Sequence, residues 1–210
     1  YFNQFHGELE MKLMQQMKYD AMTMGNHDFD IGLSGFHKAY SNNATFPVVC
    51  SNYDFSNTIL KNTTIPHLII RKGSLKIGVF GLGVELDGLV GKKNYEDTQY
   101  LDPVKCANEK ASYLRHDDMC DLVICLSHLG YLYKSKKISD TSLAEATSNI
   151  DLIIGGHTHT FLDEPTIHEN SAGKKVIVNQ VGFGGINLGR IDFYFADSIP
   201  SNKAQLLRIG

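Results

Sequence analysis

The sequence predicts an α/β fold, because amphipathic helices alternate with short, continuously apolar runs along the chain. The second half shows this pattern twice: a predicted helix over residues 103–116 precedes the apolar run 121–126, and one over residues 141–149 precedes the run 151–155. Runs that are apolar at every position are typical of strands covered on both faces. The chain has 210 residues, of which 42% are hydrophobic, and we expect residues 1–210 to form a single domain.

The first half contributes two helices and several strands. Leu9, Leu13 and Met17 recur at a spacing of four and predict an amphipathic helix over residues 8–18. A weaker helix is predicted over residues 34–40. The other elements are a very short strand at 21–24, a buried strand at 46–50 and a hairpin formed by 65–71 and 75–82.

The second half begins with a clear helix start. Asp102 supplies a capping carboxylate, and Pro103 suits the first helical position because its missing N–H would have no partner there. The last predicted strands are residues 176–179 and 191–195, joined through a glycine cluster at 182, 184 and 185.

Composition and charge exclude several classes of protein. Lys and Arg total 20 against 23 Asp and Glu, a net charge of −3 with neutral His, which argues against a nucleic-acid-binding protein. No apolar run approaches the length of a membrane span. The four cysteines (Cys50, Cys106, Cys120 and Cys125) form no C-x-x-C pair, which excludes a zinc ribbon, and their low density in a chain of this length argues against a disulfide framework. Cys50, Cys120 and Cys125 stand in apolar runs and are expected to be buried.

Three polar motifs follow predicted strands, where α/β sheets gather their ligands. They are Gly25-Asn26-His27-Asp28, Ser127-His128 and Gly155-Gly156-His157-Thr158-His159. Imidazole and amide groups at adjacent strand ends can converge on one point, as metal coordination requires. Each motif is weak alone: a lone Ser-His is more often a hydrogen-bonded core histidine, and only the Gly-Gly-His-Thr-His loop favours a metal by itself.

In an extended loop, the side chains of His157 and His159 lie on the same side, where they share one ion or each hold one of a close pair. Ligation by His with Asn and carboxylate oxygens suits Zn, Mn or Fe better than Ca. Two neighbouring metals are the usual device for hydrolysing phosphoesters. His27 is then the candidate for stabilising developing charge, with Asp30 orienting its ring. The remaining five histidines are expected to be surface or structural residues: His6, His37, His67, His116 and His168.

Together, Gly25-Asn26-His27-Asp28-Phe29-Asp30, Ser127-His128 and Gly155-Gly156-His157-Thr158-His159 resemble the calcineurin-like metallophosphoesterases, most closely the catalytic domain of the 5′-nucleotidases. The resemblance covers nearly the whole chain. It implies a four-layer α/β/β/α sandwich with two divalent metals at the strand ends. It also implies a small nucleotide or phosphoester substrate and a periplasmic or secreted location.

Carried over by position, the resemblance makes Asn26, His128 and His157 ligands of one metal and His159 a ligand of the other. It makes His27 the transition-state-stabilising imidazole and Asp30 its partner. Asp28 stands where the family often has Glu.

The sequence departs from the family pattern in one respect. The family takes further ligands from an Asp-x-His and a Gly-Asp motif, and neither motif occurs in this sequence. Both are expected to precede Tyr1, so the sandwich is expected to be N-terminally incomplete and to lack the family's C-terminal nucleotide-binding domain. Two alternatives to a 5′-nucleotidase-type phosphoesterase therefore stay open: an incomplete fragment or pseudo-enzyme acting as a metal-binding module, and a hydrolase of sulfur esters with a similar site.

Overall fold

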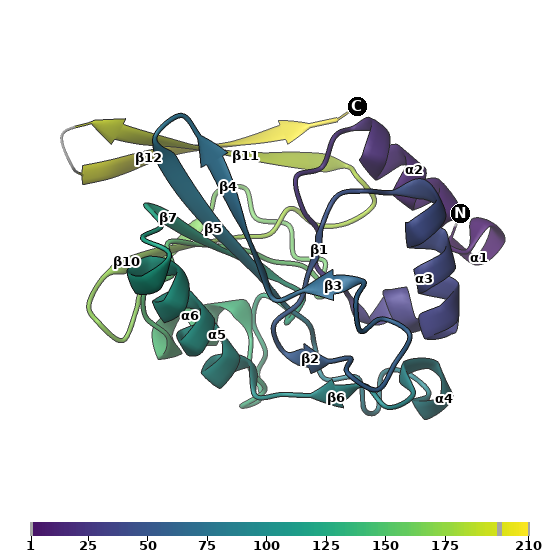
Figure 1. The fold of residues 1–210 in the computed structure, drawn as a ribbon. Coiled ribbons are helices and arrows are strands. Elements are labelled where there is room, and N and C mark those ends of the chain that lie inside the picture. The colour runs from purple at the N-terminus through teal and green to yellow at the C-terminus, as the bar shows by residue number, and fades with distance from the viewer. Residues whose placement is uncertain (1, 197–198, 210) are drawn as a thin grey trace.

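The computed structural model describes residues 2–196 and 199–209, and a six-stranded sheet lies at its centre (Figure 1). The strand order is β4-β5-β7-β8-β10-β9. The strands are β4 (His67–Lys72), β5 (Leu75–Leu82), β7 (Leu122–Ser127), β8 (Leu152–Ile154), β9 (Thr166–Glu169) and β10 (Lys175–Asn179). The predicted hairpin of 65–71 and 75–82 is confirmed as β4 and β5, which pair antiparallel.

Strands β5, β7, β8 and β10 are parallel, whereas β4 and β9 are antiparallel edge strands. Parallel neighbours end at the same edge of a sheet, so the segments that follow β7 and β8 emerge side by side. His128 directly follows β7, and His157 follows β8 by three residues. The topology therefore brings together two of the three motifs.

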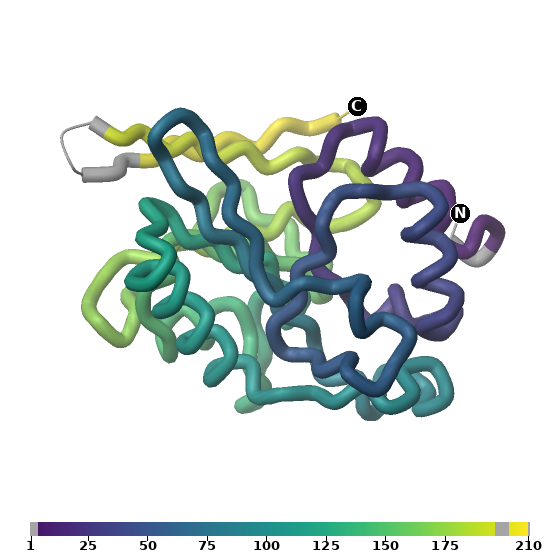
Figure 2. The backbone as a smooth tube through the Cα atoms, in the orientation of Figure 1, coloured from purple at the N-terminus to yellow at the C-terminus, as the bar shows by residue number. Residues whose placement is uncertain are grey.

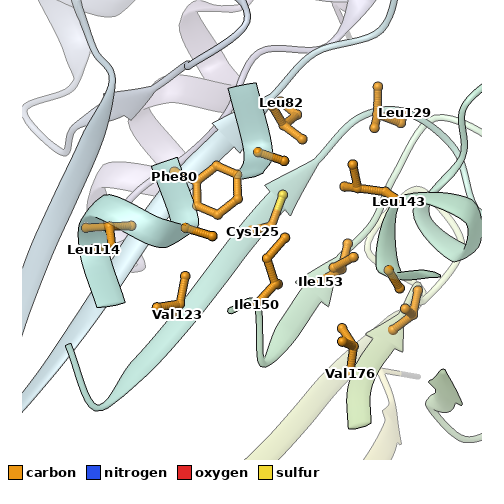
Figure 3. Packing of buried hydrophobic residues seen from close by; sticks show 14 of the residues in the cluster. Phe80, Leu82, Leu114, Val123, Cys125, Leu129, Leu143, Ile150, Ile153 and Val176 are labelled. Carbon is orange, nitrogen blue, oxygen red and sulfur yellow. The ribbon is translucent and has the colours of Figure 1, made fainter. Parts of the chain in front are cut away.

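One face of the sheet is covered by α5 (Pro103–Ser112), the π-helical turn η2 (Tyr113–Asp117) and α6 (Asp140–Ala146). The predicted start of α5 is confirmed, because the carboxylate of Asp102 accepts a hydrogen bond from the Lys105 backbone N–H at 2.7 Å. Figure 3 shows the resulting core, in which Phe80, Val123 and Cys125 of the sheet pack with residues of these helices.

The opposite face of the sheet is only partly covered. A hairpin of β11 (Asn187–Ala196) and β12 (Ile199–Arg208) faces it, and a cavity of about 960 Å³ lies between them. The run 121–126 was expected to be covered on both faces. Ile124, which lines this cavity, and Leu126, two positions further along the same face of the strand, are only half-buried. The predicted strand at 191–195 is confirmed as part of β11, which pairs with β12.

The N-terminal segment before β4 packs beside the sheet around a second core that includes Met24, Phe29 and Leu33 (Figures 1 and 2). The predicted helices are confirmed as α2 (Glu8–Gln16) and α3 (Gly32–Asn43). The strand expected at 21–24 is reduced to one bridge between Met22 and Val48. The remaining elements are α1 (Phe2–Phe5), the 3₁₀ turn η1 (Asn26–Phe29), α4 (Lys92–Tyr95), β1 (Val48–Val49), β2 (Tyr53–Asp54), β3 (Thr64–Ile65) and β6 (Gln99–Tyr100).

The α/β class is thus confirmed, with β11 and β12 supplying the second β layer in the described part of the chain. Cys50, Cys120 and Cys125 are buried, as their apolar settings predicted, and all four cysteines are free. Within residues 2–196 and 199–209, no helix has the length and apolar character needed to cross a membrane.

Candidate metal centre

Three side chains from distant parts of the chain converge at the carboxyl edge of the sheet. The amide oxygen of Asn26, in η1, lies 3.1 Å from Nε2 of His128 and 2.9 Å from Nδ1 of His157. The two imidazole rings are 5.1 Å apart between centroids and inclined at 60°. We call Asn26, His128 and His157 the three-residue cluster.

Burial makes both imidazoles of this cluster neutral. It lowers the pKa of His128 from 6.5 to about 3, with smaller contributions from His157 and His27. The pKa of His157 is also lowered, by burial first and by Lys137 second. A neutral imidazole offers a nitrogen lone pair to a metal, whereas a protonated one does not.

The donor set fits a transition-metal ion. Ligand bonds of about 2.0–2.1 Å place neighbouring donor atoms roughly 3 Å apart, and both nitrogens lie at such distances from the Asn26 oxygen. Two imidazoles with one oxygen suit Zn, Mn or Fe. In the described residues, no group of three His, Cys, Asp or Glu side chains is suited to hold a metal; the third donor here is an amide.

Glycines allow the backbone to approach this cluster. A Cβ at Gly25 would lie 2.5 Å from Cε1 and 2.6 Å from Nε2 of His128, so η1 reaches this ring only because residue 25 lacks a side chain. Gly156 also lies close to this ring, since a Cβ at that position would be 3.1 Å from Nδ1 of His128. The glycines of two motifs therefore enclose the same imidazole.

The loop carrying His157 and His159 is not extended, contrary to the expectation. Both histidines adopt left-handed backbone conformations, with φ of 70° and 53°. Such conformations are uncommon for residues other than glycine and need support from their surroundings. The alternation that puts the two side chains on one side therefore does not apply here.

Gln180 holds this loop in place. It directly follows β10 and is almost fully buried. Its amide nitrogen donates to the Gly156 carbonyl at 2.7 Å, and its amide oxygen accepts from the Thr160 backbone N–H at 2.5 Å and the Thr158 hydroxyl at 3.1 Å. These bonds bracket both histidines, and sequence reasoning missed Gln180 because nothing in its local sequence marks it.

His159 lies outside the three-residue cluster and is exposed. Its ring stacks against Phe183 at a centroid distance of 5.1 Å, and Phe183 in turn meets Phe161 at 5.6 Å. Phe183 sits between Gly182 and Gly184, which have φ of 83° and 67°. The glycine cluster thus turns the chain so that an aromatic ring lies beside His159, a contact that sequence reasoning also missed.

His27 and Asp30 form a pair at the exposed side of η1. Nδ1 of His27 lies 2.8 Å from a carboxylate oxygen of Asp30. Asp28 faces inward instead, accepting the Gly25 backbone N–H at 2.7 Å, and burial raises its pKa to about 6. In this motif, the Asn26 amide therefore points inward, the His27 imidazole points outward, and the Asp28 carboxyl group stabilises the turn.

The histidines expected to be surface or structural residues have partners elsewhere. His37 lies 3.0 Å from the Thr63 hydroxyl, and His67 lies 3.6 Å from Asp118. His168 contacts Thr166 at 3.0 Å.

Known proteins resemble this chain in both sequence and structure. Residues 2–161 match the calcineurin-like phosphoesterase family. The trifunctional nucleotide phosphoesterase protein YfkN of Bacillus subtilis is 29% identical over 98% of this chain, and the snake venom 5′-nucleotidase of Crotalus adamanteus is 28% identical over 94%. The chain spans only 16% and 35% of those two proteins.

The crystal structure of a 5′-nucleotidase precursor from Thermus thermophilus superposes on the whole chain with a TM-score of 0.87 and 28% identity, covering 42% of that protein. The family match covers most of the sequence, including Asn26, His128 and His157. The chain therefore belongs to the calcineurin-like phosphoesterase family.

Proposed function

We propose that the chain carries catalytic groups of a metal-dependent phosphoesterase of the 5′-nucleotidase type, which hydrolyses nucleotide phosphomonoesters. The observation that carries the proposal is the approach of two neutral imidazoles to one amide oxygen, at 3.1 and 2.9 Å. Three metal-ligand side chains at the carboxyl edge of the sheet, together with the exposed imidazole of His27, are suited to the hydrolysis of phosphoesters. The names of the relatives, a nucleotide phosphoesterase and a 5′-nucleotidase, support the substrate class.

Asn26, His128 and His157 would hold one divalent ion, and His159 would contribute to a second. When bound, such ions supply Lewis-acid activation of water and neutralise phosphate charge. Because the pKa values of His128 and His157 are lowered, both imidazoles are unprotonated at neutral pH and can bind a metal without first releasing a proton. The Phe183 ring fixes the orientation of the exposed His159 imidazole.

His27 would act on the substrate rather than on a metal. Its side chain is 72% exposed, and its Nδ1 is engaged by Asp30 at 2.8 Å. With Nδ1 holding the proton shared with the carboxylate, Nε2 is the atom that faces the phosphoester, and a protonated ring donates there to the developing charge. Asp30 fixes the orientation of the ring through this contact.

The proposal includes a secreted or periplasmic location, which the resemblance to a venom 5′-nucleotidase supports. Small-molecule substrates fit the net charge of −3, which offers no basic excess for a nucleic-acid polymer.

A second candidate function is a metal-binding module without turnover. One observation favours it: among the described residues, no carboxylate joins the three-residue cluster, and His159 contacts an aromatic ring rather than a second metal-ligand side chain. A dinuclear centre needs more donors than these four side chains.

Metal content and phosphate release from one preparation test both candidates. The chain is supplied with Mn²⁺ or Zn²⁺, its bound metal is counted, and hydrolysis of AMP and of bis-p-nitrophenyl phosphate is measured. The phosphoesterase proposal predicts bound metal and release from AMP. Bound metal without hydrolysis of either ester would favour the metal-binding module, and absence of bound metal would contradict both candidates.

The variant His27→Asn separates substrate chemistry from metal binding. It should abolish turnover and leave the metal content unchanged, because His27 contacts Asp30 rather than the three-residue cluster. His116→Asn is the matched control, since this histidine lies in η2, away from the strand ends. Equal loss of metal and turnover in His27→Asn would mean that His27 is itself a ligand.

A further inference from the structure

The carboxyl group of Asp140 lies between the two segments that carry His128 and His157. Asp140 is the first residue of α6 and is fully buried against the ends of β7 and β8. It does not cap its helix, because the hydroxyl of Ser139 accepts the bond from the Ser142 backbone N–H. Helix capping therefore does not explain why a carboxyl group is buried here.

At the end of β7, Asp140 forms hydrogen bonds to the chain before and after His128. Its Oδ1 accepts a hydrogen bond from the Ser127 hydroxyl at 2.5 Å, and that hydroxyl also receives the Leu129 backbone N–H at 3.2 Å. The Asp140 backbone N–H donates to the Gly130 carbonyl at 2.7 Å. The segment 127–130 is thus bonded to Asp140 at two points, one on each side of the histidine.

On the β8 side, the other oxygen meets the segment leading to His157. Oδ2 of Asp140 lies so close to Gly155 that any Cβ at that position would overlap it. This oxygen is buried, and it has no hydrogen-bond partner among the described residues. A buried polar atom without a partner is costly and calls for a reason to be kept.

We infer that Asp140 is a positioning residue, which fixes the separation of His128 and His157 by joining Ser127 to the Gly155 turn. The inference rests on the proposed function, since the separation matters if both imidazoles bind one ion. The rings lie 5.1 Å apart, and the Asp140 carboxyl group bonds the Ser127 hydroxyl on one side and packs against Gly155 on the other. Removing the carboxyl group frees the two strand ends to move relative to each other.

The neutral acid is the form that this environment favours. Burial raises the pKa of Asp140 to about 7, against a smaller lowering by the Ser127 hydrogen bond. The titratable groups near it are Cys125 of β7 and Tyr133, and burial raises the pKa of each. Asparagine reproduces the shape of the neutral acid and its acceptor oxygen, so Asp140→Asn should preserve the positioning.

Titration with Co²⁺ tests this role, because the visible absorption of bound cobalt reports ligand geometry independently of activity. Four proteins are compared at pH 6.5: wild type, Asp140→Ala, Asp140→Asn and Leu143→Val. Leu143 is fully buried in the same helix and contacts the core, so its substitution controls for general loss of stability. Thermal melts establish that each variant is folded at the temperature of the titration.

We expect Asp140→Ala to bind cobalt at least tenfold more weakly, with an altered spectrum, and the other two variants to match wild type. Equal binding and spectra for Asp140→Ala and wild type would overturn the inference alone. Loss of binding in Asp140→Asn or in Leu143→Val to the same extent as in Asp140→Ala would also overturn it. Absence of cobalt binding by wild type would overturn the proposed metal centre and the inference with it.

Discussion

The amide oxygen of Asn26 lies 2.9 Å from Nδ1 of His157, although 131 positions separate the two residues in the chain. The contact joins the turn after the N-terminal helices to the loop after β8. The same oxygen lies 3.1 Å from Nε2 of His128, so one amide links three motifs.

Asn26→Ala should weaken Zn²⁺ or Mn²⁺ binding by at least about tenfold, because it removes the oxygen donor shared by both imidazoles. Asn26→Asp is the matched variant: it keeps an oxygen at the same position and should retain binding. Isothermal titration calorimetry measures both. Undiminished affinity in Asn26→Ala would show that the amide is not a ligand.

Gly25→Ala should disrupt metal binding without any change to a ligand. Its Cβ would lie 2.5 Å from the His128 ring, which must then move. Gly91→Ala serves as the control, because a Cβ there meets nothing within 4 Å and the φ of −62° suits alanine. We expect Gly91→Ala to bind metal normally and to gain up to about 1 kcal/mol of stability through its stiffer unfolded chain. Similar metal affinities for the two variants would contradict the close approach of Gly25 to His128.

Gln180→Ala should destabilise the fold by about 1–3 kcal/mol, since it leaves buried partners in the 156–160 loop without hydrogen bonds. The loop itself should be affected more than the stability of the whole fold, so backbone hydrogen exchange at Thr158 and Thr160 should become faster. Gln99→Ala, at an exposed position of β6, should change neither quantity. Unchanged exchange in the loop of Gln180→Ala would show that the left-handed histidines are held by other contacts.

Asp140 should make the stability of the metal-free chain depend on pH. Its pKa is about 7 in the folded state against an ordinary 3.8, so between these values the folded chain keeps a proton that the unfolded chain has lost. The free energy of unfolding should therefore fall as the pH rises through this window, by about 1.4 kcal/mol per pH unit. Asp140→Asn removes this contribution.

Urea denaturation in the presence of EDTA at pH 5, 6, 7 and 8 tests this dependence. The stability of Asp140→Asn relative to wild type should increase up to about pH 7 and then level off. A constant difference between the two proteins across the series would show that Asp140 is not retained as the neutral acid.

Much of the fold could be predicted from the sequence because it follows from local patterns. The periodic apolar residues of α2, the capping pair Asp102 and Pro103, and the apolar runs of β7 and β8 each act over a few neighbouring positions. Predictions were wrong where the outcome depended on distant partners. The run 121–126 was expected to be covered on both faces but faces a cavity on one side, and the strand expected at 21–24 is reduced to one bridge.

The sequence by itself determined which side chains are available for chemistry: Asn26, His27, His128, His157 and His159 follow turns or strands in motifs that identify the family. Only the tertiary structure decided how they are grouped. It brings Asn26 together with His128 and His157, leaves His159 against Phe183, and adds Gln180 and Asp140 from other elements. The physical reason is that packing brings the turn η1 against the ends of two parallel strands and so joins residues more than 100 positions apart, and no local pattern records those contacts.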